Sequence, residues 1–302
     1  MSKMLEGKVV VVTGAGGGIG RDLALACAAQ GAKVVVNDIG TSTTGEGTDA
    51  GPAQKVVDEI KAAGGEAMAN GASVTDFDAV QAMVQQAIDA WDRVDIVVNN
   101  AGILRDKSFA KMELADFRLV LDVHLMGAVH LCKAVWPHMV AQKYGRILMT
   151  TSSTGLYGNF GQANYGAAKL AQVGLMQTLS IEGAKHDIRV NALAPTAATR
   201  MTEGLLPPEV MEAIKPEAVV PAMLVAVSEQ APSRMIFAAG AGTYEAAHIT
   251  LTQGVHLGLT PDTPERLLAA LAQVADRAGE TVPMSGAEQG TNEVKQALAT
   301  RR

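Results

Sequence analysis

The chain has 302 residues, of which 48% are hydrophobic and 19% are charged, as in a globular protein with a sizeable core. Its net charge of −6 argues against nucleic acid or an anionic membrane as the main partner. The apolar run near the N-terminus is too short to span a membrane and lacks a signal cleavage site, so a cytoplasmic location is expected.

Apolar runs of strand length alternate with amphipathic stretches of helix length along most of the chain. Buried strands are predicted over residues 9–13, 33–37, 95–99, 146–151 and 188–193. Helices are predicted over residues 19–30, 53–63, 77–91, 114–142 and 163–185. This alternation indicates βαβ units and therefore an α/β fold, a Rossmann-type doubly wound parallel sheet with helices on both faces.

The connections and the C-terminal part are less regular. Residues 40–52, rich in Gly and Thr, are predicted to form a long surface loop, and residues 235–237 an edge strand. We expect one domain over residues 1–253 and a C-terminal helical extension over residues 254–302 that forms a dimer contact or covers the substrate.

Within the extension, a helix is predicted over residues 264–277, with Thr263 as its N-cap and Gly279 just after it. The polar residues 285–302 are expected to be partly disordered. Cys27 and Cys132 lie in apolar helical stretches without metal-ligand spacing, which indicates buried thiols and no metal site.

A glycine-rich turn, Thr13-Gly14-Ala15-Gly16-Gly17-Gly18-Ile19-Gly20, joins the first predicted strand to the first helix. Glycines let the backbone approach a pyrophosphate closely, and the helix N-terminus offers free N–H groups and the positive end of its dipole. With a strand before it and a helix after it, the turn predicts dinucleotide binding rather than a plain tight connection.

Asp38 ends the second predicted strand and has Asn37, Ile39 and Gly40 as neighbours. A carboxylate at this position accepts hydrogen bonds from the adenosine ribose and repels a 2′-phosphate, which predicts NAD rather than NADP. The alternative is an ordinary loop carboxylate in solvent.

Tyr165 and Lys169 are four residues apart in a predicted helix and therefore share one face. A phenol is a poor base because its pKa is about 10. An adjacent ammonium and an oxidised nicotinamide would bring that pKa toward neutrality. Ser152, at the end of a predicted strand, could hydrogen-bond the substrate oxygen.

Together these motifs resemble the short-chain dehydrogenase/reductase family over about residues 5–202. The matching residues, in chain order, are Thr13-Gly14, Gly18-Ile19-Gly20, Asn99-Asn100-Ala101-Gly102, Ser152, Tyr165 and Lys169. The resemblance implies that Ser152 orients the substrate, that Tyr165 is the acid/base, and that Lys169 also anchors the nicotinamide ribose.

The resemblance further implies a set of cofactor-binding residues in addition to Tyr165 and Lys169. They are Gly14, Gly18, Ile19, Gly20, Asp38, Ser73, Val74, Asn99, Ala101, Gly102, Pro195 and Thr199. Asn99 would help to hold the central strand against the cofactor, and Thr199 would contact the carboxamide or the phosphates.

Three positions depart from the family pattern. The family usually has an asparagine whose main-chain carbonyl supports a proton-relay water, and His124 stands there. His124 either preserves that relay as a fourth catalytic residue or is a helix-packing histidine. Ser73 replaces an aspartate that commonly contacts adenine, and Pro195-Thr196 replaces the usual Pro-Gly.

Three segments are similar to the (3R)-hydroxyacyl-CoA dehydrogenase domains of peroxisomal multifunctional enzymes type 2, which are also described as 17β-hydroxysteroid dehydrogenases. The segments are residues 36–38 with the loop that follows, residues 99–106 and residues 157–165, and the similarity also includes residues 194–195 and 200–202. The hydratase and sterol-carrier domains of those enzymes are absent from this sequence, so a free-standing relative is expected.

The leading hypothesis is NAD-dependent oxidation of a (3R)-3-hydroxyacyl-CoA, as in fatty acid β-oxidation. The first alternative is a hydroxysteroid or other secondary-alcohol dehydrogenase, and the second is a non-catalytic NAD-binding regulator. The expected partners are a small-molecule substrate, here an acyl-CoA thioester, and further copies of the chain in a homodimer or homotetramer. Neither nucleic acid nor a membrane is expected as a partner.

Overall fold

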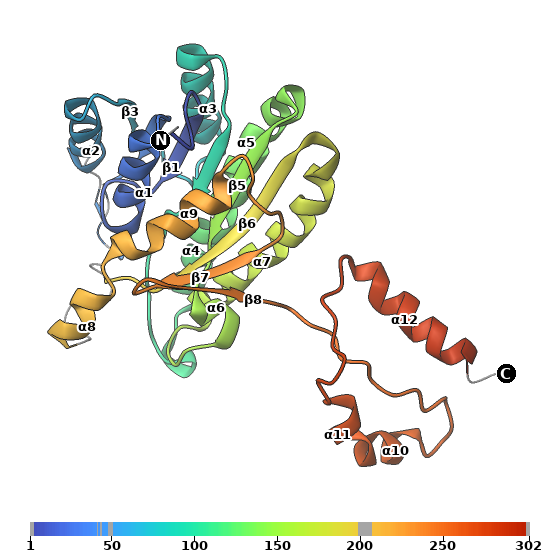
Figure 1. Cartoon of the computed structure of the whole chain (residues 1–302). Helices are drawn as coiled ribbons and strands as arrows, with labels where there is room; N and C mark the ends of the chain where they lie inside the picture. The colour runs from blue at the N-terminus through green and yellow to red at the C-terminus, as the bar shows by residue number, and fades with distance from the viewer. Residues whose placement is uncertain (1–2, 41, 43, 48–50, 199–206, 300–302) are drawn as a thin grey trace. The chain divides into compact units, whose positions relative to one another are not determined.

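A computed structural model describes residues 3–40, 42, 44–47, 51–198 and 207–299. The chain forms two compact units, Met1–Ala246 and Ala247–Arg302, and each is described by itself. The first unit contains the predicted Rossmann-type sheet (Figure 1).

The sheet has eight strands in the order β3-β2-β1-β4-β5-β6-β7-β8. The strands are β1 (Val9–Thr13), β2 (Lys33–Asn37), β3 (Glu66–Asn70), β4 (Ile96–Asn99), β5 (Gly145–Thr150), β6 (Ile188–Pro195), β7 (Ile236–Gly240) and β8 (Thr243–Ala247). All neighbours from β3 to β7 pair in parallel. The carboxyl ends of β1 to β7 therefore lie along one edge of the sheet.

Two strands differ from expectation. β3 was not predicted, because its sequence Glu-Ala-Met-Ala-Asn has one fully buried side chain and lies at the sheet edge. The strand predicted at residues 235–237 is present as β7, but it is not an edge strand, because β8, which was not predicted, lies outside it. Ala241 and Gly242, with φ of 50° and 74°, form a two-residue reverse turn that lets β8 fold back beside β7.

Helices cover both faces of the sheet (Figure 1). They are α1 (Gly18–Ala29), α2 (Gly51–Ala62), α3 (Phe77–Trp91), α4 (Leu114–Leu121), α5 (Gly127–Gln142), α6 (Ser153–Tyr157), α7 (Ala163–Gly183), α8 (Pro208–Ala213) and α9 (Val220–Val227). Helices α1, α2 and α9 share one core with alternate strand residues such as Val10 and Val98. Helix α5 packs on β4 and β5, and α7 on β5 and β6.

The predicted helix over residues 114–142 is present, but a π-helical turn, Asp122–Met126, separates α4 from α5. By length and composition alone, Leu114–Gln142 could cross a membrane. In this fold its buried residues, among them Val120, Leu131 and Val135, belong to the packed core. Core packing therefore accounts for part of its apolar character, since 39% of its most apolar window is buried.

The second unit contains α10 (Thr263–Ala269), α11 (Leu271–Val274) and α12 (Gly286–Ala299). The prediction of one helix over residues 264–277 is wrong, because Ala270, with φ −94° and ψ 4°, interrupts it. Thr263 is not the cap: Asp262 precedes the helix, and the Thr263 hydroxyl accepts the Thr260 N–H at 2.8 Å.

The expectation of partial disorder over residues 285–302 is also wrong for most of that stretch, because α12 occupies it. The Glu288 N–H donates to the Ser285 carbonyl at 3.2 Å, a main-chain bond at the start of the helix. Gln289 and Glu293 add a hydrogen bond one turn apart.

Candidate active site

The glycine turn between β1 and α1 has the backbone that the sequence predicts. Gly14 and Gly18 have φ of 63° and 52°, in the region that favours glycine. A Cβ on Gly20 would lie 2.2 Å from the Gly14 carbonyl oxygen, so no larger residue fits there. Ile19 packs against the core behind the turn, and no side chain caps the α1 N-terminus at Gly17.

Asp38 joins this turn to the end of β2. Its carboxylate accepts the N–H of Gly16 at 2.8 Å and that of Gly40 at 2.7 Å. The carboxylate is therefore an ordered part of the turn, at the position where a Rossmann fold meets an adenosine ribose.

Two residues that the sequence reasoning did not select, Thr13 and Asn100, connect the turn to β4. The Thr13 hydroxyl accepts the N–H groups of Asn100 and Ala101 at 3.0 and 3.1 Å. The Asn100 amide donates to the carbonyls of Thr13 and Gly14 at 3.1 and 3.2 Å. Both residues lie inside the motifs already quoted. Their polar side chains, next to the glycine turn, could have indicated these hydrogen bonds from the sequence alone.

Asn99, which was selected, lies differently. Among the described residues, its buried amide nitrogen donates to the sulfur atoms of Cys132 and Met149, at 3.6 and 3.5 Å. Asn100 therefore makes the strong hydrogen bonds between strand and turn, and a cofactor role of Asn99 stays a prediction.

His124 lies in the π-helical turn, and its side chain faces the loop after β4. Its Nε2 is 3.1 Å from the Ile103 nitrogen and 2.9 Å from the Ile103 oxygen. Its ring packs edge-on against the Tyr165 ring at 5.2 Å. Burial, and next the positive charge of Lys169, hold the pKa of His124 well below its usual value, so the ring is neutral.

The predicted catalytic residues come together beside this histidine. Ser152 follows β5 and caps α6, with its Oγ accepting the Thr154 N–H at 3.1 Å. Tyr165 lies in the first turn of α7, and Lys169 lies one turn further on. The Lys169 Nζ donates to the Thr150 carbonyl at 2.5 Å and is 5.5 Å from the centre of the Tyr165 ring.

Burial controls the protonation of both groups. It lowers the pKa of Lys169 to about 7. It raises the pKa of Tyr165, against the opposing effect of a hydrogen bond with Ser152 and with a smaller contribution from the charge of Asp106. A positive charge brought next to the phenol would therefore favour its ionised form.

The loop that precedes Tyr165 is tied to the loop after β4. Gln162 donates to the Asp106 carboxylate at 2.7 Å, and the buried Asn164 donates to the Arg105 carbonyl at 3.0 Å. The Asn164 side chain also accepts the Tyr165 N–H at 2.8 Å. The sequence reasoning missed Gln162 and Asn164, although both lie in a quoted segment.

The other predicted cofactor residues lie along the same sheet edge. Ser73 and Val74 follow β3, with the Ser73 and Thr75 hydroxyls 2.8 Å apart and the Val74 carbonyl 2.8 Å from the His130 Nδ1. Pro195 ends β6. Thr199 lies outside the described residues. The predicted residues that are described thus follow β1 to β6, at the edge where such sheets bind dinucleotides.

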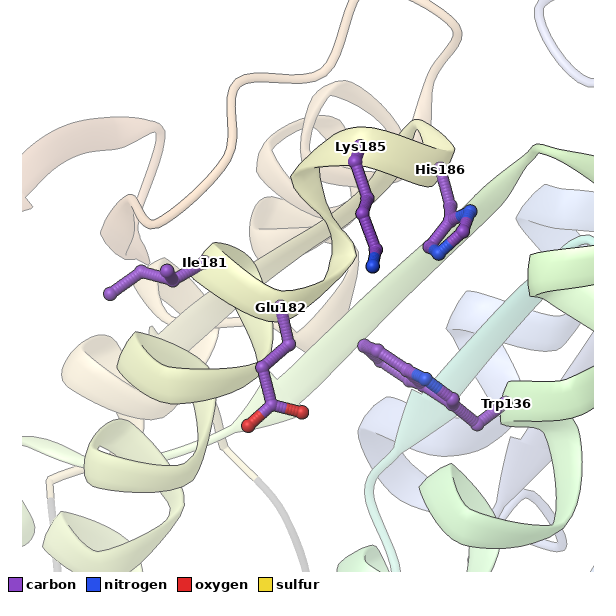
Figure 2. A pocket seen from close by; sticks show the side chains of 5 residues that line it. All are labelled: Trp136, Ile181, Glu182, Lys185 and His186. Atoms are coloured by element: carbon purple, nitrogen blue, oxygen red, sulfur yellow. The ribbon is translucent and has the colours of Figure 1, made fainter.

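A separate pocket lies between α5 and the far end of α7 (Figure 2). Its lining residues are Trp136, Ile181, Glu182, Lys185 and His186. None of the predicted site residues borders it. Both cysteines are buried free thiols, as predicted. No cluster of metal-ligating side chains occurs among the described residues.

Comparison with known proteins identifies the relatives of this chain. The family model for short chain dehydrogenases matches residues 8–209. Peroxisomal multifunctional enzyme A of Dictyostelium discoideum is 47% identical over 289 residues, which cover 95% of this chain and 64% of that enzyme.

Two solved structures extend the comparison. Full-length peroxisomal multifunctional enzyme type 2 of Drosophila melanogaster is 35% identical with a TM-score of 0.81, over 98% of this chain and 50% of that one. A 7α-hydroxysteroid dehydrogenase complexed with NADH and 7-oxo glycochenodeoxycholic acid is 32% identical with a TM-score of 0.71, over 80% of this chain and 96% of that one. The chain thus spans about a third to two thirds of the multifunctional enzymes it matches.

Proposed function

The chain belongs to the short-chain dehydrogenase family, and from that premise we propose that it oxidises a (3R)-3-hydroxyacyl-CoA to the 3-ketoacyl-CoA with NAD. The observation that carries this proposal is the convergence of Ser152, Tyr165 and Lys169 beside the glycine turn, at one edge of the sheet. A mere dinucleotide-binding regulator has no need of a buried lysine next to a partly buried tyrosine.

The residues present fit NAD(H), which the related hydroxysteroid dehydrogenase binds as NADH. The cradle at Gly14 and Gly20 excludes side chains where a pyrophosphate would approach. Asp38 offers a carboxylate toward the ribose, which favours NAD over NADP. When bound, the nicotinamide supplies the acceptor for the hydride from the substrate carbon.

The chain's own residues supply the proton chemistry. The Ser152 hydroxyl orients the substrate oxygen, and the Tyr165 phenolate accepts the hydroxyl proton. Lys169, held by the Thr150 carbonyl, stabilises that phenolate. Gln162 and Asn164 fix the start of α7, from which Tyr165 projects.

A hydroxysteroid or other secondary alcohol is the second candidate substrate. It is supported by the likeness to the hydroxysteroid dehydrogenase at 32% identity. The multifunctional enzyme from Dictyostelium is more similar, at 47% identity over more of the chain, and this favours the acyl-CoA. The two multifunctional relatives carry "peroxisomal" in their names, whereas the cytoplasmic location of this chain stays a prediction.

The test is NAD reduction by the purified chain with (3R)- and (3S)-3-hydroxyacyl-CoA esters of several lengths, and with a steroid alcohol. We expect turnover of the 3R esters only, and a kcat/KM at least about tenfold lower with NADP than with NAD. Turnover of the steroid alone would favour the second candidate. No reduction with any ester of either hand would overturn the proposal.

We also propose that the chain forms a homodimer or homotetramer. None of the described residues of the second unit is buried, and several of its large apolar side chains are more than half exposed. The most exposed are Leu259, Leu268 and Met284. A further copy of the chain would cover this apolar surface. Sedimentation equilibrium should give two or four times the chain mass of 31.3 kDa, and a monomer would contradict this.

A further inference from the structure

Gln172 is a buried glutamine on α7 that none of the motifs above includes. It lies three residues after Lys169 and therefore on the same face of the helix. Its side chain is 1% exposed. Glutamine is seldom buried so deeply, because its amide must find hydrogen-bond partners away from water.

The nitrogen of the Gln172 amide has such a partner. The Gln172 Nε2 donates to the main-chain carbonyl of His124 at 2.9 Å. That carbonyl belongs to the π-helical turn, and the His124 ring packs on Tyr165. Gln172 thus links the helix that carries Tyr165 and Lys169 to the turn that lies against them.

The amide oxygen of Gln172 is one of several buried polar atoms without a hydrogen-bond partner in the described part of the chain. Among the described residues, Gln172 Oε1, His124 Nδ1 and Thr150 Oγ1 are buried without a hydrogen-bond partner. Gln172 is bonded to His124, and the Thr150 carbonyl accepts from Lys169. Buried polar atoms are nearly always paired, and these three belong to residues that hydrogen-bond to one another or to Lys169. We infer that this group, called here the polar compartment, takes up a hydrogen-bonding species during the reaction cycle.

We propose that Gln172 is a positioning residue for proton transfer, which holds the His124 carbonyl and supplies an amide oxygen to the compartment beside Lys169. The inference rests on the proposed function. Gln172 acts through His124 and Lys169.

The electrostatic consequence follows from the groups that face Lys169. Tyr165 is on the same helix, His124 faces it from the π-helical turn, and β5 contributes the neutral Thr150. Asp106 acts on Tyr165 from the loop after β4. An amide oxygen on the same helix face, three residues from Lys169, would stabilise the ammonium, so we expect its removal to weaken the support that Lys169 gives to the phenolate.

The test uses Gln172→Leu and Gln172→Glu in the full chain with NAD bound. For Gln172→Leu we expect kcat to fall about tenfold with KM nearly unchanged, and the acid limb of the kcat profile to move up by about 0.5 pH unit or more. A glutamate can donate to the His124 carbonyl only while protonated. The loss in Gln172→Glu should therefore grow as the pH rises.

The matched control is Gln142→Leu. Gln142 ends α5 and bridges the N–H and carbonyl of Val94 with its own amide, at 3.2 and 2.9 Å. This change should lower the unfolding temperature and leave the pH profile in place. If Gln172→Leu leaves both kcat and profile as in the parent, or changes them no more than Gln142→Leu does, Gln172 has only a structural role.

A second measurement does not depend on the substrate. The ionisation of Tyr165 can be followed by ultraviolet difference spectroscopy of the NAD complex, with the Tyr165→Phe protein as the blank. In Gln172→Leu the phenolate should form at higher pH than in the parent, and an unchanged titration would refute the inference. Lack of turnover in the parent would instead count against the proposed function alone.

Discussion

Replacing Tyr165 with phenylalanine is expected to lower kcat for alcohol oxidation by about 10³-fold. The change removes one oxygen atom and keeps the ring that packs edge-on against His124. The dissociation constant for NAD, measured by fluorescence titration, should stay within about threefold of the parent, because the glycine turn and Asp38 are untouched. Stopped-flow measurement of NADH formation would separate loss of chemistry from slow product release.

Tyr157→Phe is the matched control for this substitution. Tyr157 ends α6, five residues after Ser152, and its side chain is 74% exposed. Removing its hydroxyl should leave kcat within about twofold of the parent. A Tyr165→Phe protein that kept a tenth of the parent rate would show that another group moves the proton.

Replacing Lys169 with methionine is expected to have two opposite effects. The kcat should fall about 10²-fold, because the phenolate loses its neighbouring ammonium. The unliganded protein should nevertheless become more stable below pH 7, because a buried charge is replaced by an apolar side chain of similar length. Urea unfolding at a series of pH values would measure this second effect.

The depressed pKa of Lys169 determines how the stability difference between Lys169→Met and the parent changes with pH. Burial depresses the pKa of Lys169 from 10.5 to about 7, so the unfolded chain binds one more proton than the folded chain between these values. The parent therefore gains stability as the pH rises through this window, and the advantage of Lys169→Met should shrink by about 1.4 kcal/mol per pH unit.

Lys61→Met gives the reference for removing a lysine from the surface, since Lys61 is exposed in the last turn of α2. A stability difference between Lys169→Met and the parent that stayed constant from pH 7 to pH 10 would contradict the depressed pKa.

The sequence predicts the parts of the molecule whose own pattern determines them. The valine runs of β1 and β2 and the amphipathic α3 have the predicted bounds, because each has a continuous apolar run or an apolar stripe of helical period. The glycine turn is predicted from the strand before it and the helix after it, and the grouping of Ser152, Tyr165 and Lys169 from the resemblance to the family.

The remaining features depend on residues far away in the sequence. The strand β3 forms because β2 offers an edge for pairing, not because of its own short and mixed sequence. Gln172 looks like any polar helix residue until α4 and α5 place the His124 carbonyl 2.9 Å from its amide. Asn100 bonds to the glycine turn and Asn99 does not, and this difference depends on which side of β4 the turn approaches.

The contact between Gly102 and His124 constrains how this site can change through evolution. A Cβ at residue 102 would lie 2.2 Å from the Cε1 atom of His124, which is itself held by the Ile103 backbone. A lineage that keeps histidine at 124 is therefore committed to glycine at 102. Alanine becomes accessible at 102 only after a smaller side chain has arisen at 124. The order of the two substitutions matters, and the pair should be inherited or exchanged together.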